Sequence, residues 1–290
     1  GIGQGLLCPL NLVGSLIPVQ NLINQPVLAF LSDDLSPQER FRCLHFIAAK
    51  PIFGWDHIVA DHTGLVRGVF DSVARRYDLM NDLMSGGLHR VWKAALQDRL
   101  NPQPDMTLLD VAGGTGDVAE GFLKRGGGGA IICDINKEML TAGMDRALDR
   151  GTALGPARIC GDAADLPVKS AGFQACTIAF GLRNVTRRTD ALAEMRRALQ
   201  PGGHFICLEF SPAVLPQIKP LYDTYSFKVL PWLGQRVAGD ADSYAYLAES
   251  IRKFPEPDQL AAEMTEAGFG NITQTPMSGG IVWLHSGWRI

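Results

Sequence analysis

The chain has 290 residues, of which 46% are hydrophobic and 20% charged, enough apolar material for a large packed core. Its formal net charge of −3 and its scattered Lys and Arg residues disfavour a nucleic-acid partner. The N-terminal region has no basic n-region and no uninterrupted apolar run of the ~20 residues that a membrane span needs. We therefore expect a cytoplasmic, metal-free protein that acts on small molecules.

The chain divides into an N-terminal extension and one domain. Residues 1–60 begin with an uncharged stretch broken by prolines and are expected to lie outside the main fold, which spans residues 61–290. Helical spacing of apolar residues in 67–77 and 89–100, joined by a Met-rich linker, predicts a helical lid over a cofactor cleft. The alternative is an ordinary helix–helix contact in which the methionines fill gaps.

A buried strand that ends at Asp110 runs into a glycine-rich turn and a helix. Gly113, Gly114 and Gly116 lack a Cβ, so a ligand can lie directly against the backbone at the carboxyl end of a parallel strand. This pattern predicts a nucleotide-binding βαβ unit.

The same turn fits the dinucleotide pattern G-x-G-x-x-G/A, so NAD and S-adenosylmethionine are both candidates. Asp110 and Asp117 bracket the turn and would repel a pyrophosphate, but they would attract the ammonium and sulfonium groups of S-adenosylmethionine. Unit charges near 4 Å interact by roughly 4 kcal/mol at an effective dielectric of about 20. This comparison favours S-adenosylmethionine over an NAD-dependent oxidoreductase.

Two further strand ends carry candidate cofactor contacts. Asp134 closes the second strand about 20 residues after Gly114, the spacing of an acid that binds the ribose hydroxyls. Ile135 beside it is a candidate for packing on the adenine ring. Asp162, followed by Ala163, ends the third strand, where it could reach the adenine amino group or form a surface Asx turn.

The remaining elements complete the fold class. Strands are predicted at 130–134, 157–160, 173–180 and 204–210, helices at 136–150, 190–199 and 257–267, a turn at 200–203, and a hairpin of strands 271–275 and 280–285. Continuous apolar strands alternating with helices indicate an α/β fold with a doubly wound, mostly parallel sheet. The antiparallel C-terminal hairpin is typical of the seven-stranded sheet of class I S-adenosylmethionine-dependent methyltransferases.

Arg183 and Asn184 follow the fourth strand and belong to no apolar stripe, so they are expected over the methyl donor. Residues 214–256 are aromatic and broken by prolines in their first part. We expect this region to be an insertion on the substrate side, where it would line a tunnel, touch a bilayer or form a packed lid.

Five motifs lie in this order at 71–85, 109–117, 180–186, 239–252 and 279–285. Together they resemble the UbiE-type ubiquinone/menaquinone biosynthesis C-methyltransferases, from about residue 66 to the C-terminus. The resemblance implies methyl transfer from S-adenosylmethionine to a ring carbon of 2-polyprenyl-6-methoxy-1,4-benzoquinol, demethylmenaquinol or both. It also implies cofactor contacts from Thr115, Asp134, Asp162 and Ala163. The sequence departs from many relatives at Asp162, often Asn, and at Ala179, where some have Ser.

The implied chemistry needs neither a metal nor a covalent intermediate, because a deprotonated hydroquinone is itself a carbon nucleophile. Arg183 is our candidate for holding the phenolate and Asn184 for orienting it, whereas the weaker candidates for a proton acceptor are Asp162, His89, Tyr244 and Tyr246. A methyltransferase for another small aromatic acceptor and a non-catalytic member of a quinone-biosynthesis complex are alternatives. A homodimer and peripheral contact with the inner face of a membrane are further partner hypotheses.

Overall fold

The computed structural model describes residues 30–31, 85–150, 155–225, 229, 236 and 241–290. The predicted helix at 67–77, most of the Met-rich linker and nearly all of the 1–60 extension lie outside these residues. Apart from residues 30–31, the described part of the chain therefore begins at Ser85, just before the second of the two predicted N-terminal helices.

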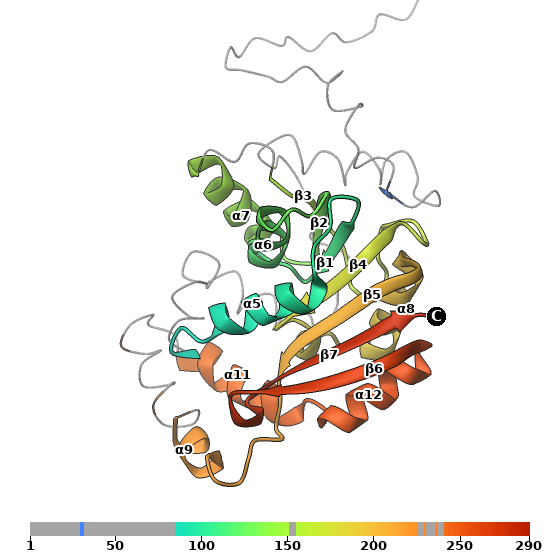
Figure 1. Ribbon diagram of the computed structural model, residues 1–290. Helices are drawn as coiled ribbons and strands as arrows, with labels where there is room; N and C mark the ends of the chain where they lie inside the picture. Colours follow the sequence, from blue (N-terminus) through green and yellow to red (C-terminus); the bar gives the residue numbers. More distant parts are fainter. Residues whose placement is uncertain (1–29, 32–84, 151–154, 226–228, 230–235, 237–240) are drawn as a thin grey trace, which may run out of the picture.

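Within the described residues, one seven-stranded sheet runs through the molecule in the order β3-β2-β1-β4-β5-β7-β6 (Figure 1). Strands β1 to β5 pair in parallel, while β7 runs antiparallel to both β5 and β6. The strands are β1 (Thr107–Val111), β2 (Gly129–Asp134), β3 (Ala157–Cys160), β4 (Phe173–Ala179), β5 (Leu199–Phe210), β6 (Phe269–Met277) and β7 (Val282–Arg289). The predicted α/β fold class is confirmed.

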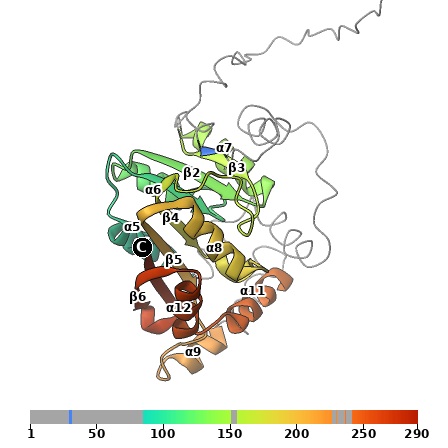
Figure 2. The same cartoon turned by 90° about the vertical axis from the view of Figure 1, so that its right-hand side faces the viewer.

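The central strands are apolar throughout because helices cover both faces of the sheet. In β1, Leu108 packs into the core on one face and Leu109 into the core on the other. The helices α8 (Arg188–Ala198) and α12 (Pro257–Glu266) cover the Leu109 face, and Figure 2 shows them on the same side of the sheet. The opposite face is covered by α5 (His89–Leu100), α6 (Asp117–Lys124), α7 (Lys137–Asp149) and α11 (Ala241–Lys253).

Most predicted elements match the structure within a few residues, but the region 200–203 differs. The sequence predicts a turn there, whereas β5 already begins at Leu199. The register shifts between the Phe173–Leu199 pair and the Ala175–His204 pair, and Gly202 has a φ of 79°. The extra residues therefore form a bulge inside the strand. The two hairpin strands are also longer than predicted.

The parallel strands all end at one edge of the sheet, where the predicted site residues gather. The short helix η3 (Leu182–Asn184) follows β4 at this edge. Beyond the end of β5 the chain forms α9 (Lys219–Thr224) and then α11 (Figure 1). The edge thus divides into a side built by β1 to β3 and a side built by η3, the end of β5 and α11.

Candidate active site

The glycine-rich turn between β1 and α6 leaves no room for a side chain at Gly113 or Gly116. Gly116 has a φ of 98°, and a Cβ added there would lie 2.6 Å from Cδ1 of Ile132. Gly114 also has a positive φ, and its backbone N–H donates a hydrogen bond of 2.8 Å to Oδ2 of Asp134. The turn is therefore a backbone surface held against β2, the kind of surface on which a ligand can lie.

Asp134 is fixed by two backbone donors. Besides Gly114, the N–H of Asn136 donates to its Oδ1 at 2.8 Å, and Asn136 in turn accepts from the N–H of Met139 to cap α7. Burial raises the pKa of Asp134 to about 6, although both hydrogen bonds oppose the shift. Each carboxylate oxygen keeps a further lone pair, so the group can accept bonds from a pair of hydroxyls.

Asp110 lies fully buried under the same turn. Its Oδ1 accepts a hydrogen bond of 2.8 Å from the hydroxyl of Thr177 on β4, and its Oδ2 occupies the space next to Gly113. Burial raises the pKa of Asp110 to about 7, against the smaller effects of Thr177 and Lys93. A cation bound beside this carboxyl would favour its ionised form.

Asp117, expected from the sequence to repel a pyrophosphate, is paired with two cations. Lys93 lies 2.8 Å from its Oδ2, and Arg146 binds its Oδ1. Although burial opposes ionisation, these two cations hold the pKa of Asp117 well below its usual range. The charge of Asp117 is neutralised locally, so it contributes little to discrimination between a pyrophosphate and a sulfonium.

The ends of β2 and β3 are tied together. The N–H of Gly161 donates to the backbone oxygen of Asp134 at 3.1 Å. Asp162 forms an exposed ion pair of 3.3 Å with Arg187, and the side chain of Ile135 is 36% exposed. This edge assembles the predicted adenosine contacts Asp134, Ile135, Asp162 and Ala163.

Arg183 is buried in an ion pair. Its Nη1 donates to Oε1 of Glu209 at 2.7 Å and to the backbone oxygen of Phe180 at 2.6 Å, and its guanidinium lies 5.6 Å from the ring centre of Phe210. The two charged side chains are only 6% and 1% exposed. Within the described residues the buried Nε of Arg183 has no hydrogen-bond partner, so the guanidinium retains a donor.

Arg183 is also close to the glycine-rich turn in the fold. A Cβ added at Gly181, two residues earlier, would lie 2.6 Å from the Cβ of Ala112 at the start of that turn. The loop after β4 therefore packs directly on the loop after β1. This contact brings the predicted catalytic pair beside the predicted cofactor surface.

Glu209 is the main residue that the sequence analysis missed. Its Oε2 accepts from the backbone N–H of Arg183 at 3.3 Å and its Oε1 from that of Phe210 at 2.9 Å. Glu209 is an acid within the buried run 204–211. A buried carboxylate needs a partner, so an acid in a predicted buried strand is the sequence signal that could have identified it. Glu209 holds Arg183 rather than facing a ligand alone.

Besides Asp162, which follows β3, the candidates for proton transfer lie on two helices. The hydroxyl of Tyr246 on α11 donates to Oδ1 of Asn184 at a long 3.4 Å. His89, at the start of α5, is buried and hydrogen-bonded to Ser85 at 2.9 Å. The backbone of Tyr244 belongs to α11, but its side chain lies outside the described residues.

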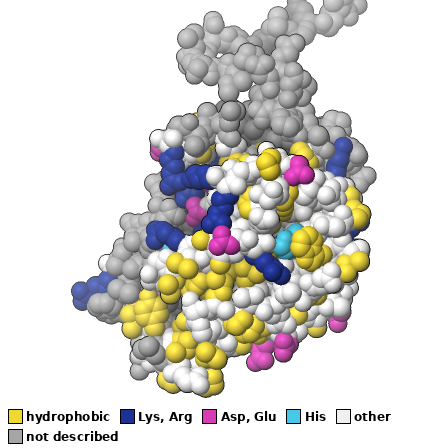
Figure 3. All heavy atoms as spheres, in the orientation of Figure 1, with side chains coloured by type: hydrophobic (Ala, Val, Ile, Leu, Met, Phe, Trp, Pro, Cys, Tyr) yellow, Lys and Arg dark blue, Asp and Glu magenta, His cyan; other side chains and the backbone are white. Residues whose placement is uncertain are grey.

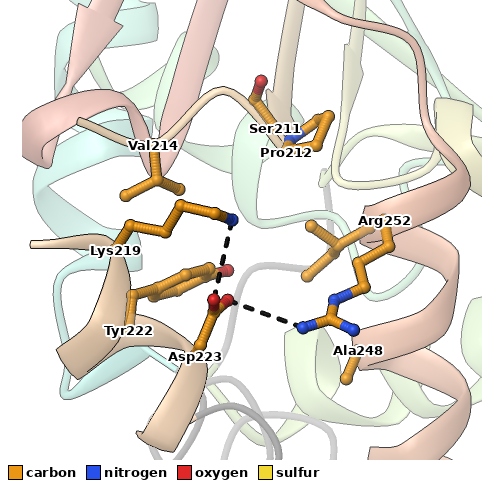
Figure 4. Close-up of a pocket in the computed structure, with 9 residues that line it drawn as sticks. Ser211, Pro212, Val214, Lys219, Tyr222, Asp223, Ala248 and Arg252 are labelled. Atoms are coloured by element: carbon orange, nitrogen blue, oxygen red, sulfur yellow. Dashed lines mark ion pairs between the residues drawn. The ribbon is translucent and has the colours of Figure 1, made fainter. Parts of the chain in front are cut away.

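A hollow of about 350 Å³, partly open to solvent, lies between α9, α11 and the residues that follow β5. Figure 4 shows the head groups of Lys219, Asp223 and Arg252 facing one another across it. Asp223 forms ion pairs of 3.6 Å with Lys219 and 3.7 Å with Arg252. The hollow lies largely in the predicted 214–256 insertion, and its lining combines apolar side chains, among them Val214 and Ile251, with this ion-paired group.

Neither a metal cluster nor a spanning helix occurs in the part of the chain that the structure describes. No group of three or more His, Cys, Asp or Glu side chains there is arranged to hold a metal ion. None of the described helices combines the length and apolarity needed to cross a membrane.

Solved structures with the same architecture include methyltransferases. A possible histamine N-methyltransferase from Thermotoga maritima aligns with a TM-score of 0.56 at 16% identity, covering 77% of this chain and 99% of that one. A phosphoethanolamine N-methyltransferase from Haemonchus contortus, solved with S-adenosyl-L-methionine, aligns with a TM-score of 0.55 at 16% identity and covers 77% of this chain and 47% of that one. At this identity the likeness establishes the class I methyltransferase fold.

The sequence comparisons are more specific. The ubiquinone/menaquinone biosynthesis C-methyltransferase UbiE of Paracoccus denitrificans is 53% identical over 231 residues, which cover 79% of this chain and 92% of the relative. The enzyme of the same name from Nitrobacter hamburgensis is 52% identical over 244 residues, covering 82% and 96%. The model of the ubiE/COQ5 methyltransferase family matches residues 58–289. These matches set aside the NAD-dependent oxidoreductase, and the chain belongs to the ubiE/COQ5 methyltransferase family.

Proposed function

We propose that the chain transfers a methyl group from S-adenosylmethionine to a ring carbon of a polyprenyl hydroquinone. The acceptors are 2-polyprenyl-6-methoxy-1,4-benzoquinol, demethylmenaquinol or both. Relatives that are 53% and 52% identical over nearly their whole length carry the names of such enzymes. The observation that carries the proposal in the structure is the buried Arg183–Glu209 pair beside the glycine-rich turn.

The residues around that turn fit S-adenosylmethionine, which supplies an electrophilic methyl group when bound. Asp110 would attract its ammonium group, and the backbone surface of Gly113, Gly114, Thr115 and Gly116 would carry its methionine part. Asp134, held by two backbone donors, would accept bonds from the ribose hydroxyls. The cofactor's adenine would lie at the adjoining strand ends, against Ile135, Asp162 and Ala163.

Arg183 would hold the oxygen of the deprotonated hydroquinone, with Asn184 orienting the ring. Its buried guanidinium is fixed by Glu209 and Phe180, so little reorganisation is needed when negative charge develops. The ring carbon next to the phenolate then forms the bond to the methyl group as the sulfur–methyl bond breaks. Loss of the proton from the same carbon restores the aromatic ring.

The ion-paired side chains Lys219, Asp223 and Arg252 meet in the hollow between α9 and α11, so we do not place the isoprenoid tail there. We expect the tail instead to remain at an apolar surface close to the site, with the protein peripheral to the membrane at its inner face. The homodimer and the quinone-biosynthesis complex stay predictions.

The test uses labelled S-adenosylmethionine with a benzoquinol and a demethylnaphthoquinol, each kept reduced, and locates the label by NMR. Label on a ring carbon of either quinol supports the proposal, and the reacting quinol identifies the substrate. Label on oxygen, or transfer only to small aromatic acceptors without a prenyl tail, would contradict it.

A further inference from the structure

We propose that one apolar face of this protein docks on an anionic lipid bilayer, next to the active site. The docking patch consists of Leu88 and Val91 at the start of α5 and of Leu215 and Ile218 before α9. The inference rests on the proposed function, because a polyprenyl hydroquinone resides in lipid. It adds the surface through which the enzyme meets that lipid.

The docking patch is exposed and apolar. Leu88, Val91 and Leu215 are 44%, 60% and 53% exposed, although large apolar side chains of this kind are usually buried. Figure 3 shows hydrophobic side chains gathered over the part of the molecule where α5 begins and α9 lies. A contiguous apolar surface of this kind marks an interaction site.

Two contacts through the β6–β7 turn join the halves of the patch. On α5, Trp92 Nε1 donates to the hydroxyl of Ser278 at 2.9 Å. The neighbouring Gly279 accepts from the N–H of Leu215 at 2.9 Å, and a Cβ added at Gly279 would meet Ile218. The two ends of the patch therefore lie on opposite sides of one short turn.

The patch also lies directly outside the wall of the active site. Trp92, one residue after Val91, points inward and packs on Phe180 and Phe210 with ring centres 6.1 and 5.9 Å apart. The guanidinium of Arg183 in turn lies over the ring of Phe210. A hydroquinone with its tail in the bilayer would have to cross only this aromatic wall to reach Arg183.

The charges around the patch complement anionic headgroups. Arg90 is exposed on α5, and the side chains of Lys219 and Arg252, which both pair with Asp223, are 51% and 57% exposed. Among these four described side chains, cations outnumber the acid, on a chain whose net charge is −3. Exposed apolar side chains with cations on the same elements are typical of surfaces that bind at the interface of an anionic membrane.

The test measures cosedimentation of the full chain with vesicles of phosphatidylcholine, with and without phosphatidylglycerol. We expect binding to the anionic vesicles that salt weakens, and a loss of about tenfold for Val91→Asp or Leu215→Asp. Leu148→Asp is the matched control, because Leu148 on α7 is 60% exposed like Val91 but lies outside the patch. Equal binding by all variants, or no vesicle binding by the wild-type chain, would overturn the inference.

Activity separates this inference from the proposed function. Val91→Asp should lose methylation of a long-tailed hydroquinone in vesicles but retain methylation of a short-tailed, water-soluble one. If the wild type methylates neither substrate, the proposed function fails. If it methylates both and the variants do likewise, the docking inference fails alone. A change in sedimenting mass of the Val91→Asp variant without lipid would assign the face to a second copy of the chain and would also overturn the inference.

Discussion

The two sides of the sheet edge are built by different means. On the cofactor side, the backbone N–H groups of Gly114 and of the N-cap of α7 hold Asp134, and the glycines of the turn leave no room for a Cβ at Gly113 or Gly116. On the substrate side, Arg183 is held chiefly by a side chain from another element, Glu209 on β5. Under the proposed function, the cofactor would therefore meet a turn and carboxylates fixed by backbone, whereas the reacting group would meet a side chain fixed by another side chain.

The largest effect is expected on the substrate side. Arg183→Ala should lower kcat on the order of 10³-fold, because it removes the group that stabilises the phenolate. Since the cofactor side does not depend on Arg183, the dissociation constant for S-adenosylmethionine should change about twofold or less. The assay combines steady-state kinetics with calorimetric titration, and near-normal turnover would remove Arg183 from the mechanism.

A paired variant controls for misfolding. Arg183→Ala leaves the carboxylate of Glu209 buried without a partner, at a cost of about 3–5 kcal/mol in the free energy of unfolding. Arg183→Met combined with Glu209→Gln removes both charges and should recover much of that stability without recovering turnover. Recovery of activity in the pair would show that the arginine acts only on stability.

The next largest effect belongs to the cofactor side. Gly116→Ala places a Cβ at a φ of 98° and 2.6 Å from Ile132. The turn must shift, so we expect affinity for S-adenosylmethionine to fall about 100-fold, or ~3 kcal/mol. Gly126→Ala is the matched control, since Gly126 has a φ of 92° with no atom near its Cβ position. Equal cofactor affinity in the two variants would contradict a turn shaped for a ligand.

A smaller effect is expected from pH. Because Asp110 has a pKa of about 7 and its ionised form attracts an ammonium, S-adenosylmethionine should bind about fivefold more tightly near pH 7.5 than near pH 6. Asp110→Asn should remove most of this dependence and leave the smaller part that comes from Asp134, whose pKa is raised to about 6. The raised pKa also predicts that the unliganded protein loses stability as the pH rises from about 4 to about 7, since only the native carboxyl still holds its proton there. Binding of S-adenosylmethionine by the wild type that does not change with pH would contradict the role of Asp110.

The smallest effect concerns the link from α11 to η3. The hydrogen bond from Tyr246 to Asn184 is 3.4 Å long, so its loss in Tyr246→Phe should lower kcat by only about two- to fivefold. Asn184→Ala, which removes the orienting amide itself, should have the larger effect of the two. A loss of order 10³-fold in Tyr246→Phe would instead identify Tyr246 as a proton-transfer group.

The sequence predicted the cofactor side better than the substrate side. Local pattern was sufficient for the glycine turn and for Asp134, because both are placed by the strand and helix that contain them. It was insufficient for Glu209, whose partner lies 26 residues away, and for Asp117, whose charge is cancelled by Lys93 on another helix. The bulge at 200–203 was also missed, since it depends on the register with β4.

The sharpest single measurement compares cofactor binding and methyl transfer in the Arg183→Met, Glu209→Gln variant. Calorimetry gives its dissociation constant for S-adenosylmethionine, and a single-turnover assay with saturating cofactor gives its rate of transfer to the reduced quinol. If the two sides of the edge work as separate units, binding stays at the wild-type value while transfer falls on the order of 10³-fold. Parallel loss of binding and transfer, or retention of both, would contradict this division.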